Sequence, residues 1–153
     1  MESNSFDIPE IDMRGFKVVS SELFTSYHKM YGITCTIWDM GITFSKASVN
    51  ALNGCERIRI EIHPSKKQLL IVPVTEKDKD GILWLKGVKE PVPKRIQCKT
   101  FTNMLYETWQ LDKSYAFRAL GRIVSNDKKV MILYDFNNHE KWKNKEKTIE
   151  QVK

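Results

Sequence analysis

The sequence predicts an α+β fold that is rich in β-strand, with two tandem strand–helix–hairpin units sharing one β core after an N-terminal helix or strand extension. Three observations predict it. Residues 41–74 read as a strand, a short helix and two further strands with few residues between them, and residues 94–136 repeat that order. A chain of 153 residues with 41% hydrophobic content buries one ordinary core, or two small cores that share a face.

The N-terminal extension begins with scattered acids and polar residues over 1–15, which predicts a flexible arm. Apolar residues from Val19 to Tyr31 then follow a helical spacing, with Ser20 or Ser21 as the N-cap and Gly32 as the stop. A strand over 15–20 is the alternative. Residues 33–38, "ITCTIW", alternate and are β-branched or aromatic, which predicts a strand.

The first unit opens with an alternating strand that ends at Lys46, where Ser45 can cap a helix over 46–52. Asn53-Gly54 ends that helix. In residues 57–62, isoleucines alternate with charged residues, so one face of this strand is buried and the other faces water.

A polar turn over 63–68 and an apolar strand over 69–74 complete the first unit. The composition then shifts to charges, glycines and prolines over 75–93, which predicts a linker. It contains the apolar island 82–85, so we expect one packed segment anchored by Trp84 and a boundary near 91–93.

The second unit repeats the first with a longer helix and a longer turn. The positions that coincide are Lys46 with Lys99, Asn50 with Asn103, Leu52 with Leu105, Arg59 with Arg118, and Lys66-Lys67 with Lys128-Lys129. Since strand–helix–strand patterns also recur by chance, the alternative is two unrelated segments of one α+β domain.

These elements divide the chain into four parts. They are a flexible arm (1–15), the first unit with its extension and linker (16–90), the second unit (91–137) and a basic tail (138–153). The tail is lysine-rich and polar with Trp142 as its one large apolar group, which indicates a frayed helix or a disordered extension.

The segments "ITFSK", "ASVNAL", "ERIRIEI" and "LLIVPV" resemble the AbrB-like swapped-hairpin superfamily. A tandem pair in one chain is similar to MraZ-type proteins, and it implies a monomeric pseudo-dimer or a homodimer with a swapped-hairpin-like β core. The chain departs from the family pattern at "SKAS" and "NGCER", and it lacks the Asp-x-x-x-Arg signature of MraZ proteins. It also resembles proteins carried by phages and conjugative elements of Gram-positive gut bacteria.

The resemblance implies double-stranded DNA as the partner and a role in regulation, or as an accessory protein of a mobile element. A formal net charge of +6 favours such a partner, or an acidic one. A sheet edge that enters a groove needs long donors on its solvent face and lysines beside the phosphates. The candidate contacts are Lys46, Arg57, Arg59, Lys99, Arg118 and Arg122, and ordinary solvated charges are the competing interpretation.

A second function class is a protein-interaction module, antitoxin-like or phage-accessory, with the same fold and no DNA site. The sequence does not indicate an enzyme, a metal site or a cofactor. The three histidines lie far apart without a nucleophile motif, and "EKDKDG" lacks the ligand spacing of a calcium loop. Aromatic residues on the second helix suit a core better than a stacking platform.

The three cysteines are widely spaced and have no Cys-x-x-Cys motif, so we expect reduced thiols. The N-terminus is acidic and polar, and no apolar run approaches the roughly 20 residues needed to span a bilayer. These features predict a cytoplasmic protein without a membrane partner.

Overall fold

The computed structural model describes residues 8–20, 32–87 and 92–144 of the chain. In chain order its elements are β1 (Thr34–Trp38), β2 (Gly41–Phe44), α1 (Lys46–Ala51), β3 (Arg57–His63), β4 (Gln68–Val74), β5 (Ile82–Leu83), β6 (Ile96–Gln97), α2 (Lys99–Thr108), β7 (Tyr115–Asn126) and β8 (Lys129–Lys143). The helix expected between Ser20 and Gly32 lies almost wholly outside the described residues. Residues 16–20 form no strand.

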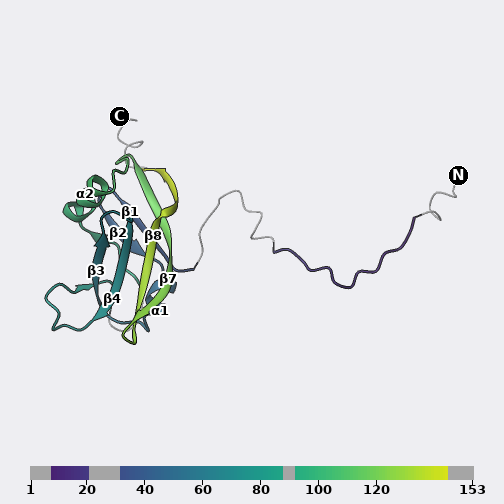
Figure 1. Cartoon of the computed structure of the whole chain (residues 1–153), viewed down its shortest axis with the longest axis horizontal. Coiled ribbons are helices and arrows are strands. Elements are labelled where there is room, and N and C mark those ends of the chain that lie inside the picture. Colours follow the sequence, from purple (N-terminus) through teal and green to yellow (C-terminus); the bar gives the residue numbers. More distant parts are fainter. Residues whose placement is uncertain (1–7, 21–31, 88–91, 145–153) are drawn as a thin grey trace.

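The strands form one antiparallel sheet in the order β5-β3-β4-β8-β7-β1-β2-β6, and this sheet curls into a half-barrel (Figure 1). The predicted β-rich architecture with short helices is therefore confirmed. The pairing of β4 with β8, from Gln68 opposite Asp135 to Ile71 opposite Ile132, joins the two segments predicted as units. β1 lies between β7 and β2, so the N-terminal strand also binds both segments together.

Helix α1 begins where the sequence predicts, because Ser45 caps it. The Ser45 hydroxyl oxygen accepts a hydrogen bond from the backbone N–H of Ser48 at 3.3 Å. At the other end, Asn53 and Gly54 adopt positive φ angles of 58° and 67°, and the Gly54 N–H donates to the Val49 carbonyl at 2.9 Å. The predicted cap and stop of this helix are both confirmed.

The core lies inside the curl of the sheet and is dominated by aromatic rings. Trp84 is fully buried, its ring centroid is 5.3 Å from that of Phe44, and its indole N–H donates to the Cys55 carbonyl at 2.6 Å. The expected anchoring role of Trp84 is confirmed. Tyr106 and Trp109, from α2 and its C-cap, are also buried, so these aromatic residues belong to the core, as expected.

Strand β8 is longer than the sequence predicts. It continues through residues 138–143, which we assigned to the basic tail. A β-bulge between Ala119 and Gly121 shifts the register, and beyond it residues 139–143 pair with 115–119. These polar residues form a strand because β7 offers them a ladder of backbone hydrogen bonds, which the composition of 138–143 does not reveal.

Candidate nucleic-acid interface

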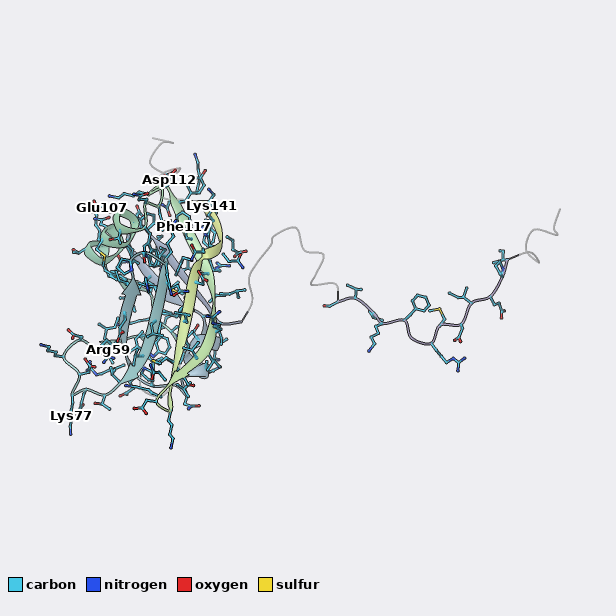
Figure 2. All side chains as sticks on the ribbon, viewed as in Figure 1. Arg59, Lys77, Glu107, Asp112, Phe117 and Lys141 are labelled. Atoms are coloured by element: carbon cyan, nitrogen blue, oxygen red, sulfur yellow. The ribbon has the colours of Figure 1, made fainter. Side chains whose placement is uncertain are left out.

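The six predicted contact residues lie on four separate elements. Lys46 and Lys99 are the first residues of α1 and α2, Arg57 and Arg59 lie on β3, and Arg118 and Arg122 lie on β7. Strands β4 and β8 separate β3 from β7, a distance along the sheet of about 14 Å. Figure 2 shows Arg59 near the lower end of the sheet and Phe117, the neighbour of Arg118, near the upper end. The structure therefore does not bring Arg59 and Arg118 together.

Arg59 is paired with two carboxylates. Its Nη1 lies 2.6 Å from Asp78 Oδ2, and its Nη2 lies 2.9 Å from Glu61 Oε2. The hydrogen bonds that the Arg59 guanidinium donates to Asp78 and to Glu61 raise the pKa of Arg59. The pKa of Asp78 is lowered, first by the backbone N–H of Asp80 and then by Arg59. The positive charge of the Arg59 guanidinium is balanced by these two carboxylates, so Arg59 is poorly suited to bind a phosphate.

Arg118 is held by three contacts on the outer face of the sheet. Its Nε donates to Thr36 Oγ1 at 3.1 Å, and its Nη1 donates to Glu140 Oε1 at 3.0 Å. The guanidinium carbon also lies 4.8 Å from the centroid of the Trp142 ring. Arg118 is thus oriented by its neighbours, and its charge is shared with Glu140.

The other four predicted residues have freer positions. Lys46, Lys99 and Arg122 are exposed, and Arg57 is half-buried. Arg122 lies near enough to Asp135 to lower the pKa of that carboxyl, although the backbone N–H of Asn137 is the larger cause. Lys46 and Lys99 make no ion pair with any residue that the structure describes.

Arg118 forms part of a groove of about 450 Å³ on the outer face of the sheet. The residues that line it are Thr36, Trp38, Thr43, Arg95, Ala116, Arg118, Trp142 and Asn144. The groove contains a second cation–π pair, because the Arg95 guanidinium carbon lies 4.4 Å from the centroid of the Trp38 ring. We call this surface the tryptophan–arginine groove.

The tryptophan–arginine groove contains two cation–π pairs, in which Arg95 is exposed above a buried Trp38 and Arg118 lies beside a half-buried Trp142. A guanidinium over an indole ring forms a planar surface on which another planar group can stack. Arg95 is exposed and has no carboxylate partner among the residues described, so it can also contact an anion. The hydroxyls of Thr36 and Thr43 supply hydrogen-bonding groups at the same site, whereas Asn144 is buried and its amide already donates to the Lys113 carbonyl at 3.0 Å.

Sequence reasoning found Arg118 but missed Arg95, Trp38 and Trp142. Trp38 shares strand parity with Thr36, opposite the buried Cys35 and Ile37, which is the one sequence signal that it faces outward. Arg95 lies in the segment predicted as the opening strand of the second unit, and nothing in the local pattern singles it out as a contact residue. Trp142 was assigned to the tail because its partner strand β7 lies more than twenty residues earlier in the chain.

No protein-family model matches this chain, and neither the curated proteins nor the solved structures include a match. Within the described ranges, no helix has the length and apolar character needed to cross a membrane. In the same ranges, no three His, Cys, Asp or Glu side chains gather as a metal site would require.

Proposed function

We propose that this protein binds nucleic acid and that the tryptophan–arginine groove is the contact for its bases. The observation that carries the proposal is the pair of arginine–tryptophan stacks lining one groove on a chain with a net charge of +6. Aromatic and guanidinium planes are the surfaces on which unpaired bases stack, and excess positive charge attracts the phosphate backbone.

The chemistry of the groove favours a single strand over a duplex. Base stacking needs an open base face, which a double helix hides. Glu140 lies beside Arg118 and disfavours a phosphate there, whereas Arg95 is free to meet one. Duplex binding through Lys46, Lys99 and Arg122 is a separate proposal. These three side chains are exposed and could contact phosphates, but they lie on three different elements and outside the groove.

We also propose that the two halves of the sheet are tandem copies in a swapped-hairpin-like arrangement. In the sheet, hairpin β3-β4 is followed by hairpin β8-β7, so the order is symmetric about the β4–β8 pair. The equivalent strands β2 and β6 also pair with each other. This order is what an approximate two-fold axis between two units would produce, and it supports a pseudo-dimer within one chain.

The proposed setting is a reducing cytoplasm and a regulatory or accessory role for a mobile element. All three cysteines are unpaired in the structure, with Cys35 buried and Cys55 and Cys98 half-buried, which suits such a compartment. The role itself rests on the resemblance of the strand–helix–hairpin segments to swapped-hairpin proteins.

Fluorescence anisotropy with a labelled single strand and the matching duplex tests the proposal. At about 50 mM salt we expect the single strand to bind more tightly, and affinity to fall steeply by about 200 mM salt as counterions are released. Replacing Arg95 and Trp142 together by alanine should weaken single-strand binding by about tenfold or more. The matched control is Arg59→Ala, since this arginine is already paired with Asp78 and should matter less than about twofold.

Equal loss of affinity in the control and in the double variant would contradict the groove as the site. Tighter binding of the duplex, lost on replacing Lys46, Lys99 and Arg122 but not the groove residues, would support the separate duplex proposal instead.

The second candidate function is a protein-interaction module. It is favoured by one observation, the large apolar side chains exposed along residues 8–20. If neither nucleic acid binds at low salt, this function becomes the better explanation of the chain.

A further inference from the structure

Residues 8–20 form an arm without helix or strand, whose apolar side chains are not covered by the other residues that the structure describes. Figure 1 shows the arm extending away from the sheet. Six large apolar residues are exposed along it, with exposed fractions of 55–98%: Ile8, Ile11, Met13, Phe16, Val18 and Val19. Within the arm, Ile11 and Met13 share one side of an extended backbone, as do Phe16 and Val18. So many exposed apolar groups in one short segment indicate a surface made to be covered.

The sheet has an apolar opening at its free edges. β5 and β6 are the two ends of the strand order, and a cleft of about 370 Å³ lies beside them. It is lined by Ile42, Ile60, Asp80, Ile82, Ile96, Gln97, Cys98 and Phe101. We call this cleft the edge opening. Ile42, a fully buried core residue, forms part of its lining, so the edge opening leads directly to the core.

The edge opening is limited by backbone hydrogen bonds on one side only. Beyond β5, the Trp84 carbonyl accepts from the Lys94 N–H at 3.0 Å, and the Val92 carbonyl accepts from the Lys86 N–H at 2.8 Å. These bonds join the chain after β5 to the chain before β6. At β5 and β6 themselves, the sheet order shows no such pairing, so the edge strands diverge and leave apolar side chains uncovered.

We propose that the arm of one copy docks into the edge opening of a second copy. The arm turns between Met13 and Phe16, where the Phe16 N–H donates to the Met13 carbonyl at 3.3 Å and Gly15 has a φ of 91°. The short extended stretch after this turn carries Phe16 and Val18 on one side, and such a stretch matches an apolar cleft flanked by free strand edges, which recognise a strand through main-chain hydrogen bonds and side-chain pockets. A second copy is the occupant because the arm of this chain points away from its own sheet (Figure 1).

Reciprocal exchange of arms would cover the exposed arm and fill the edge opening in both copies at once. Each copy has one arm and one edge opening, so two exchanged arms form a closed, symmetric dimer without leaving a free arm. Covering both arms brings the contact toward the roughly 1,200–2,000 Å² that stable interfaces bury. The tryptophan–arginine groove shares no lining residue with the edge opening, so this inference goes beyond the proposed function and does not depend on it.

The native cysteines provide the test, because Cys98 lines the edge opening and Cys55 does not. The full chain is alkylated at about 1 µM and about 100 µM, and each thiol is followed by mass spectrometry while light scattering gives the mass. We expect a dimer at the higher concentration, with Cys98 alkylated at least about fivefold more slowly than at the lower concentration. Cys55 serves as the internal control and should react at the same rate in both.

Variants then assign the protection to the arm and to the edge opening. Phe16→Ser with Val18→Ser should give a monomer with fast Cys98 alkylation at both concentrations, and Ile82→Lys in the cleft should do the same. The matched control is Ile123→Ser with Val130→Ser, two exposed apolar residues on the β7–β8 hairpin, and it should still dimerise.

Two outcomes would overturn the proposal. One is a monomer at both concentrations in which Cys98 reacts as fast as in the arm variant. The other is a monomer with slow Cys98 alkylation at both concentrations, which would place the chain's own arm in its edge opening.

Discussion

At the scale of single residues, one buried hydroxyl ties helix α1 to the sheet. Tyr134 on β8 donates to the Ser48 hydroxyl at 2.6 Å, and Ser48 in turn donates to the Thr34 carbonyl on β1 at 3.1 Å. Burial raises the pKa of Tyr134 far above its ordinary value, so the phenol keeps its proton and remains a donor at neutral pH. Three elements distant in sequence therefore meet at this pair of hydroxyls.

Removing the Tyr134 hydroxyl should be costly. We expect Tyr134→Phe to lower the free energy of unfolding by about 1–3 kcal/mol, because the buried Ser48 hydroxyl loses its donor. The midpoint of urea unfolding measures this loss. Tyr115→Phe is the control, since its ring contacts Lys141 but its phenol makes no hydrogen bond with any of the described residues, and its midpoint should match the wild type. An unchanged midpoint for Tyr134→Phe would contradict the network.

The Arg59–Asp78 pair makes stability depend on acid pH. Since the pKa of Asp78 is lowered in the folded state, the stabilisation it contributes is complete above the unfolded pKa, near pH 4, and is lost as pH falls through the folded pKa. We expect Arg59→Met to be less stable than the wild type near neutral pH and equally stable at about pH 2. Unfolding by urea at the two pH values measures the difference.

The control for this pH effect is Arg14→Met. Arg14 pairs with Asp12 at 2.7 Å, but both side chains lie on the exposed arm and stabilise no folded contact with the sheet. A stability deficit of Arg59→Met that persists at low pH would show that packing of the long side chain, and not its charge, is responsible.

At the scale of elements, strand β6 depends on a glycine in its neighbour. β6 is held to β2 by only two residue pairs, Gly41 opposite Gln97 and Ile42 opposite Ile96. A side chain at Gly41 would meet the Ile96 carbonyl oxygen and the Trp38 ring. The close approach of the two backbones is therefore possible only without a Cβ atom.

We expect Gly41→Ala to destabilise the protein by about 1–3 kcal/mol, because β6 must move away from β2. Thermal or urea unfolding measures the loss. The matched control is Gly87→Ala, since no atom of the described residues lies within 4 Å of a Cβ atom built at Gly87, and this change should be neutral. Equal effects at the two glycines would contradict a close β2–β6 approach.

At the scale of the whole molecule, the two segments predicted as units that share a β core lie in one sheet. β4 pairs with β8, β2 pairs with β6, and β1 pairs with both β2 and β7. Trp84, from the linker between the segments, is buried against Phe44 of the first, and Phe44 in turn packs on Tyr134 of the second at 5.7 Å. Neither segment has a core of its own.

Because the core is shared, we expect a single cooperative unfolding transition. Circular dichroism of the strands and tryptophan fluorescence should give coincident urea curves. Alkylation of the buried Cys35 should begin only within that transition, which reports opening of the shared core. Two separate transitions, or Cys35 reacting before the fluorescence changes, would show instead that the segments unfold independently.

Local pattern predicted the elements whose signals are short-range. Ser45 and the Asn53-Gly54 step predicted the start and the end of helix α1. The alternation of isoleucine with charged residues predicted strand β3. Trp84 was recognisable as an anchor because it is a large apolar residue within a polar linker. The paired state of Arg59 was not predictable, since Asp78 lies nineteen residues away and reaches it only through the loop after β4.

The sequence by itself determined that this chain is β-rich, where the two helices of the described residues lie, and which face of β3 is apolar, because these properties depend on neighbours within a few residues. Only the tertiary structure decided that β8 extends to Lys143, that Arg118 and Arg95 share a groove with two tryptophans, and that β5 and β6 leave an opening. Those features arise from strand pairing across long separations in the chain. Such pairing depends on the combined packing of the whole sheet, which local periodicity does not encode.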